Sequence, residues 1–327
     1  AKYQVSEKLG LKLGRQILSY DNERLVGSLD WAMQGRSFDA LKGIYKFNPN
    51  SKLEAVVTYN NDDNDLNDLP EKEIYSIAEA GEITKSLQII HYDYSGKNKF
   101  QFSAIAMNQV LQNPSGAHYD LLTVGINSKK YLENIGFFGS AYYQTGKNTL
   151  AQSKNAYQFS ANVDFLIHSK FNVILGTEWL SGRNFDTDSG ENKSFSPMYG
   201  TNHLHNGFMD YFYFGNSHFN SFGLNDYYLK SNLKFSPNSI LQANLHAFTS
   251  NGKLGFDTSG EKIPSYLGTE LDLVFTHKIG KSITANLGHS FMFSGKSMEY
   301  LKNVPEPKNL QTWSWIAFRI APNFKIK

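Results

Sequence analysis

The stretch that decides the fold is Tyr157-Gln158-Phe159-Ser160-Ala161-Asn162-Val163-Asp164-Phe165. Its odd-numbered residues are apolar and its even-numbered residues are polar. Successive side chains of a β-strand point to opposite faces of the sheet, so this period of two separates the two kinds of residue. The stretch therefore predicts a strand with one apolar face and one polar face.

The same alternation recurs from one end of the chain to the other. It is clear in Leu53–Tyr59, Leu241–Ala247 and Leu271–Phe275. Similar segments give about fourteen candidate strands. They begin near Leu9, Asp39, Lys52, Leu87, Phe100, Leu122, Phe137, Tyr157, Phe171, Tyr227, Leu241, Leu271, Ile283 and Gln311.

The connections between these strands alternate in length. Tight links, such as Asn48–Ser51, Glu133–Gly136 and Gly280–Lys281, interleave with long polar ones, such as Asp21–Ser37 and Ser181–Phe222. Short turns on one side and long loops on the other are typical of outer-membrane barrels, in which the short turns are periplasmic. The alternation predicts antiparallel neighbours in an up-and-down order.

Composition is aromatic yet polar on average. The 327 residues include 24 Phe, 19 Tyr and no Cys, and the mean hydropathy is -0.43. The longest apolar runs are far shorter than the roughly 18 residues that a membrane-spanning helix needs. Barrel strands need apolar side chains only at alternate positions. The net charge of +2 leaves no basic excess for binding nucleic acid.

A soluble β-sandwich or jelly roll is the alternative all-β fold. A sandwich buries the inner faces of its sheets in an apolar core. The polar face here carries Lys52, Glu54, Asp164, Glu178, Lys230, Lys234, Glu270 and Asp272. We therefore expect an all-β, antiparallel, up-and-down transmembrane β-barrel that forms a single domain over residues 1–327.

Two segments carry a family resemblance. The first is Leu13–Tyr20 (LGRQILSY), continued by Glu23–Gly27, Asp30-Trp31 and Gly35–Asp39. The second is Met198–His203 (MYGTNH), followed by Gly207–Phe212 and Gly223–Tyr227. In this order they resemble the glycine-arginine-glutamine strand with its loop, and the later glycine-histidine and methionine-aspartate signature, of the alginate export family.

The resemblance implies a barrel in the outer membrane of a Gram-negative bacterium. Members have eighteen strands, whereas about fourteen are visible here, so we expect either a smaller barrel or missing N-terminal strands. No signal peptide opens the chain, and export is inferred from the fold. Outer-membrane lipids or lipopolysaccharide would surround such a protein.

The resemblance also implies a channel that passes an anionic polysaccharide such as alginate, or another acidic solute, through a cation-lined pore. The alternative function is a structural or docking barrel with a plugged lumen in a larger envelope complex, with envelope proteins as partners. No nucleophile elbow, P-loop or dinucleotide motif is found, so we expect neither an enzyme nor a cofactor.

Inward-facing cations are the candidate pore residues. If Leu9, Leu11 and Leu13 face lipid, Lys12 faces the lumen, and a bulge at Gly14 would turn Arg15 inward. The same reasoning applies to the next strands. The full predicted pore-lining set is Lys12, Arg15, Arg24, Arg36, Asp39, Lys42, Lys46, Arg183, Lys230 and Arg319.

The loop from Asp21 to Asp39 carries Arg24 and Arg36. The resemblance implies that it folds into the barrel as part of the constriction, while a mixed-charge sequence by itself favours a solvated outer loop. Arg319 is luminal if Ile316 and Phe318 face lipid. The opposite register would instead turn Trp313 and Trp315 outward.

Two places in the sequence carry side chains that could bind a metal ion. His203 and His205 lie two residues apart, but no further His or Cys lies near them in the sequence. The acidic run Asp62–Asp68 lacks the glycine and the glutamate of a calcium loop. We expect no metal site at either place.

Overall fold

The computed structural model describes residues 1–31, 34–60, 83–113, 115–212, 221–304, 306 and 308–322. They form a single sheet of sixteen strands. The fourteen long strands are β2 (Leu9–Gln16), β3 (Phe38–Asn48), β4 (Ser51–Tyr59), β5 (Ile83–Ser95), β6 (Phe100–Gln112), β7 (His118–Leu132), β8 (Ile135–Lys147), β9 (Ser153–His168), β10 (Phe171–Leu180), β12 (Leu224–Ser236), β13 (Ser239–Thr249), β14 (Tyr266–Ile279), β15 (Ile283–Ser294) and β16 (Leu310–Ile320).

The remaining elements are short. They are β1 (Lys2–Gln4), β11 (Glu191–Asn192), the 3₁₀ turn η1 (Asn202–Leu204) and the helix α1 (Ser297–Lys302). No helix in the described ranges is long and apolar enough to cross a membrane. The wall is therefore built from strands alone.

Each long strand pairs antiparallel with the next along the chain, so the predicted up-and-down order is confirmed. The fourteen predicted segments correspond to the fourteen long strands. Several strands begin earlier than the alternation indicated; β9, for example, begins at Ser153 rather than Tyr157. Backbone pairing continues there beyond the apolar positions, because Ser153 pairs with Lys147 of β8.

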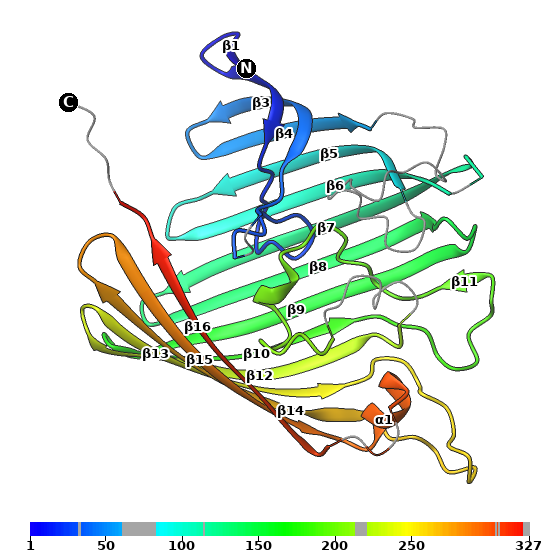
Figure 1. Cartoon of the computed structure of the whole chain (residues 1–327). Helices are drawn as coiled ribbons and strands as arrows, with labels where there is room; N and C mark the ends of the chain where they lie inside the picture. The colour runs from blue at the N-terminus through cyan, green and yellow to red at the C-terminus, as the bar shows by residue number, and fades with distance from the viewer. Residues whose placement is uncertain are drawn as a thin grey trace.

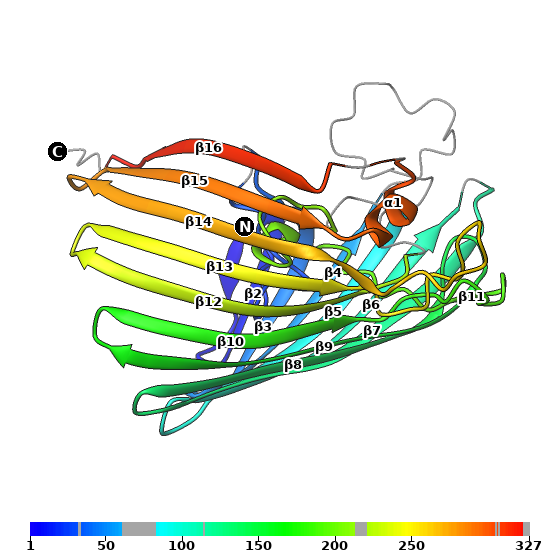
Figure 2. The ribbon, with the colours of Figure 1, turned by 90° about the horizontal axis from the view of Figure 1, so that it is seen from below.

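The sheet curls round, so that β16 approaches the side from which the chain started (Figure 1). Figure 2 shows the short turns at one end of the strands and the long connections, with α1, at the other. Within the described ranges no pairing joins β16 to β1 or β2, and the wall is open along that side.

The two faces of the wall invert the usual arrangement of a soluble protein. On the outward face Leu13, Leu175 and Leu287 are 60%, 58% and 56% exposed. On the inward face Glu270 and Asp272 are fully buried. A sandwich buries its apolar side chains and exposes its charges, so the sandwich alternative is wrong and the face that carries the leucines meets lipid.

Two connections fold into the space that the wall encloses (Figure 1). We call residues 17–31 and 34–37 the first inserted segment, and residues 194–212 the second inserted segment. Leu18, Leu25 and Val26 of the first are 2% exposed or less, in one apolar cluster with Ile89 and Met107 of the wall. The core of this protein therefore lies inside the barrel.

Candidate functional site

Arg24 joins the first inserted segment to the wall. Its Nε lies 2.8 Å from Oε1 of Glu178, and its Nη2 lies 2.6 Å from Oε2 of the same carboxylate. Both side chains are almost fully buried. This is the bidentate geometry in which an arginine binds a carboxylate most strongly.

The second inserted segment completes the same network. Arg24 also donates to the side-chain oxygens of Asn202 and Asn206, and Asn206 donates to Glu178 at 2.9 Å. Beside them, burial and the charge of Arg24 lower the pKa of His205 to about 3. The two amides therefore satisfy hydrogen bonds of the ion pair, and a neutral histidine lies beside it.

The other inward carboxylates hold the inserted segments as well. Glu270 accepts from the backbone N–H of Met209 at 2.8 Å, and Asp272 accepts from that of Phe208 at 3.3 Å. Glu54 pairs with Lys42 at 3.2 Å. These acids therefore have partners inside the protein before any solute arrives.

Asp21 is a third anchor of the first inserted segment. Its carboxylate lies 3.0 Å from Nε2 of His91 and accepts hydrogen bonds from Ser103 and Asn127. Next to it, Tyr20 donates to Glu54 at 3.2 Å, and burial raises the pKa of the Tyr20 phenol, which stays a donor at neutral pH. The first inserted segment is therefore bound to the wall through Tyr20 and Asp21 and again through Arg24.

The two inserted segments also hold each other. The backbone N–H of Gly27 donates to Tyr199 at 2.8 Å, and that of Thr201 donates to Glu23 at 2.9 Å. The Arg36 guanidinium donates to the carbonyl oxygens of Tyr199 and Gly200. The loop from Asp21 to Asp39 thus folds inward, as the family resemblance implied, and is not a solvated outer loop.

Among the predicted pore residues, Lys12, Lys42, Lys46 and Lys230 lie at inward positions of their strands. Lys12 is opposite Lys42 and shares its face with the buried Gln16. Lys230 stands over the ring of Tyr228, with its Nζ 4.7 Å from the ring centroid.

Arg319 also lies at an inward position. It is opposite Thr284 on β15, and on the same face Trp313 is opposite the buried Ser290. The register that places Ile316 and Phe318 outward is therefore the one adopted. Trp315 on the inward face covers Gly288, where an added Cβ would lie 2.2 Å from the indole ring.

The prediction that Arg15 turns inward is wrong. Pairing of β2 with β3 runs through Gly14 without a shift, so no bulge interrupts the alternation. Arg15 shares the outward face of Leu13 and forms an ion pair with Asp39 at 2.7 Å, and these two side chains are 67% and 61% exposed. Asp39 is outward for the same reason, on the face of Leu41.

Arg183 lies in the connection after β10, outside the strands of the wall. Its guanidinium carbon is 4.1 Å from the ring centroid of Phe222. Its backbone N–H donates to Ser221 at 2.8 Å. These contacts place it at the end of the long connections, away from the short turns.

Inward cations gather near the short turns. On the fourteen long strands, the inward positions within four residues of a short-turn end carry seven cations and three acids, and the acids are Glu54, Asp93 and Asp164. We call these seven the basic mouth. It consists of Lys12, Lys46, Lys52, Lys129, Lys234, Lys278 and Arg319.

Sequence reasoning missed Lys129 and Lys278. Lys129 and Lys130 are adjacent polar residues that break the alternation, so the sequence does not indicate which of the two points inward. The register settles it, because Lys129 is opposite Phe138 and stands 5.2 Å from that ring centroid.

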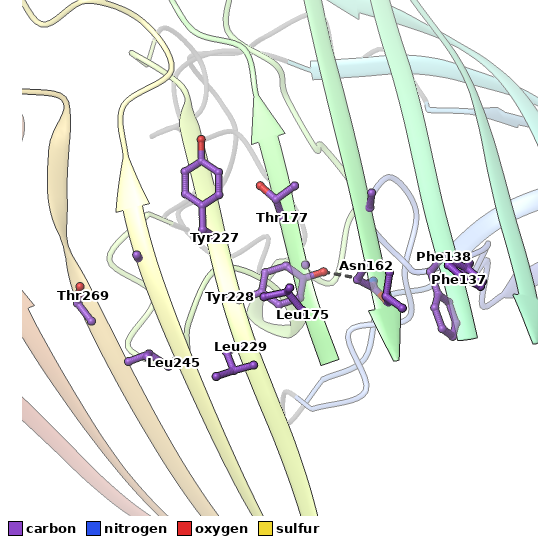
Figure 3. A pocket seen from close by; sticks show the side chains of 14 residues that line it. Phe137, Phe138, Asn162, Leu175, Thr177, Tyr227, Tyr228, Leu229, Leu245 and Thr269 are labelled. Carbon is purple, nitrogen blue, oxygen red and sulfur yellow. Dashed lines mark hydrogen bonds between the residues drawn. The ribbon is translucent and has the colours of Figure 1, made fainter. Parts of the chain in front are cut away.

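A hollow of about 640 Å³ lies in the wall between β8 and β14. Leu175, Tyr227, Leu229 and Leu245 line it from the outward face, whereas the Tyr228 hydroxyl accepts a hydrogen bond from the side-chain amide of Asn162 (Figure 3). Most of its lining residues are on the outward face, so the hollow opens toward lipid.

His203 pairs with Asp210 at 2.7 Å, and His205 lies apart from them in the Arg24 network. In the part of the chain that the structure describes, no three His, Cys, Asp or Glu side chains are grouped to hold a metal ion. The run Asp62–Asp68 lies outside the described residues.

An antiparallel wall with an apolar outside, a polar inside and segments folded into the lumen defines an outer-membrane β-barrel channel. The family model for alginate export matches residues 2–304, and the chain belongs to the alginate export family. It is a protein of the Gram-negative outer membrane, surrounded by lipid and passing solutes. No curated protein matches the chain.

Solved structures with this fold include channels of Pseudomonas aeruginosa. OpdK with vanillate is 11% identical with a TM-score of 0.61, and the match covers 97% of this chain and 76% of that one. OccK5 (OpdH) is 10% identical with a TM-score of 0.62, covering 99% and 80%. OprD is 11% identical with a TM-score of 0.58, covering 95% and 75%. At these identities the likeness concerns the fold.

Proposed function

We propose that this channel passes an anionic polysaccharide, such as alginate, or a smaller acidic solute, and that the basic mouth attracts it. The observation that carries the proposal is the excess of inward cations, seven against three acids, near the short turns. Rings of basic side chains replace part of the hydration that an anion loses in a narrow pore. They also raise the local concentration of anions at the entrance.

The inward acids do not cancel this field, because the buried ones are already neutralised or hydrogen-bonded. Glu178 is paired with Arg24, and Glu54 with Lys42 and with Lys52 of the basic mouth, which leaves six mouth cations against Asp93 and Asp164. Exposed cations such as Lys46 and Lys234 remain open to solvent. Chain-like solutes with regularly spaced carboxylates suit several such cations at once, because each step along the pore exchanges one contact for the next.

The test is the reversal potential of the protein in a planar bilayer under a salt gradient. We expect a preference for anions, and we expect the double variant Lys46→Gln/Lys234→Gln to reduce it. Lys253→Gln is the matched control, since it removes the same charge from an exposed site in the connection after β13. A wild-type channel that prefers cations, or a double variant indistinguishable from the control, contradicts the proposal.

The second candidate is a non-conducting barrel that serves as a docking subunit of an envelope complex. The inserted segments favour it, because their contacts with Glu178, Glu270 and Asp272 fill part of the lumen. It predicts stoichiometric partners on purification and no conductance. In both proposals the chain acts as one domain over residues 1–327 and not as an enzyme.

A further inference from the structure

Trp31 is a large aromatic side chain left half-open inside the barrel. It belongs to the first inserted segment, yet its exposed fraction is 52%. Neighbouring apolar residues of that segment, such as Leu25 and Val26, are 2% exposed or less. A side chain that anchors a loop buries its ring, whereas much of this ring remains accessible.

One face of the indole is firmly supported. The Trp31 and His203 rings stack with centroids 4.2 Å apart at 27°, and Phe208 stacks beyond His203 at 5.7 Å. His203 is held in place by Asp210, whose Oδ2 lies 2.7 Å from Nδ1. Phe208 is held through its backbone N–H by Asp272 of the wall. The stack thus connects Trp31 to β14.

Hydrogen bonds also hold Leu29, two residues before Trp31, and Arg36, five residues after it. Before it, the Leu29 N–H donates to the Thr201 hydroxyl at 3.0 Å. After it, the Arg36 N–H donates to the Ser28 carbonyl at 2.6 Å, and the Arg36 side chain binds the Gly200 carbonyl. An aromatic ring that is already held by a stacked neighbour loses little conformational entropy when a ligand covers its other face.

We propose that Trp31 is a stacking platform for a pyranose ring of the polysaccharide that passes the channel. The faces of a pyranose present C–H groups, which suit an indole face, and its rim presents hydroxyls and carboxylates. Asp30 precedes the platform and Arg36 follows it in the same loop, so both a hydroxyl-accepting carboxylate and a cation belong to the segment. Binding sites commonly combine such an apolar surface with a few polar groups. The inference rests on the proposed function and adds the residue that recognises the sugar ring.

The experiment records blocking of single-channel current by oligomannuronates added to the wild type and to Trp31→Phe, Trp31→Leu and Trp31→Ala. We expect Phe to keep most of the affinity, and Leu and Ala to weaken it by about tenfold, the scale of one aromatic stacking contact. Leu is the matched control, because it keeps an apolar side chain at the same place and removes the ring. The small-ion reversal potential should be the same in all four proteins.

Two results overturn the inference. One is a Trp31→Leu channel blocked as strongly as the wild type. The other is an anion-selective wild type that no oligomannuronate blocks. Failure of the proposed function looks different, since it appears as cation preference in the reversal potential. Block by neutral oligosaccharides that disappears in Trp31→Leu would then still support the platform.

Discussion

The half of the lumen near the long connections and the half near the short turns use charge in opposite ways. In the first, Arg24 is 1% exposed and is bound to Glu178 and two amides. In the second, Lys46 and Lys234 are exposed at inward positions. A cation with a complete set of protein partners acts as a structural link, whereas a hydrated cation can exchange its water for a passing anion.

The cations that the sequence pattern and the family resemblance placed in one pore-lining set fall into two groups in the structure. Arg24 and Arg36 connect the inserted segments, and Lys12 and Lys46 belong to the basic mouth. We therefore expect anion selectivity to depend on Lys12 and Lys46, and pore width to depend on Arg24 and Arg36.

The largest effect is expected from Arg24→Ala, because it leaves the buried carboxylate of Glu178 without its partner. Breaking a buried ion pair from one side costs about 3–5 kcal/mol. We expect the inserted segments to detach from β10, which lowers the unfolding temperature and raises or destabilises the single-channel conductance. Thermal unfolding in detergent and single-channel recording measure the two effects.

The controls for this prediction separate charge from packing. The double variant Arg24→Met/Glu178→Gln removes both charges and should be more stable than Arg24→Ala alone. Arg24→Lys keeps the charge but loses the bidentate contact and should lie between them. If Arg24→Ala matches the wild type in both measurements, the Arg24 network does not hold the segments.

A smaller effect is expected from acidification through His205. Its folded-state pKa is about 3, below the ordinary 6.5, because the ring is buried and faces Arg24. Between these two values the unfolded chain binds a proton that the folded protein does not, so stability falls as the pH falls from about 6.5 towards 3. The loss is at most about 1.4 kcal/mol for each pH unit.

Hydrogen exchange of residues 202–206 at pH 7 and pH 4.5 measures this effect. We expect faster exchange at the lower pH in the wild type and a weaker dependence in His205→Gln. His203→Gln is the control, since His203 pairs with Asp210 on the other side of η1. The same dependence in His205→Gln as in the wild type would assign the pH effect to another group, with Glu178 the first to test.

The strands of the wall could be predicted from the sequence, because the alternation of apolar and polar residues is a local property of each strand. The period of two identified all fourteen long strands and the inward faces of Lys12, Lys42 and Lys46. The sequence did not predict correctly which way Arg15 points, because that depends on the backbone geometry at Gly14. The glycine at position 14 suggested a bulge, and its φ is indeed 108°, yet the pairing of β2 with β3 passes through it without a shift.

The hydrogen-bond network around Arg24 could not be predicted from local sequence patterns, for a different reason. Arg24 and Glu178 are 154 residues apart in the chain, and no spacing rule connects a loop arginine to a strand carboxylate at that distance. Family resemblance gave the inward fold of the loop but not its partner. The stacked position of Trp31 on His203 depends on the same long-range meeting of the two inserted segments.

The smallest effect is expected from Arg15→Ala, which removes a cation from the outward face. This side chain is on the outward face, is paired with Asp39, and does not face the solute path. The reversal potential should equal that of the wild type, while Lys46→Gln/Lys234→Gln in the same membrane should shift it. Asp39→Ala removes the partner and should behave like Arg15→Ala. A loss of anion preference in Arg15→Ala as large as in the double variant would place Arg15 inside the pore. It would also contradict the distinction between the cations that hold the inserted segments and those of the basic mouth.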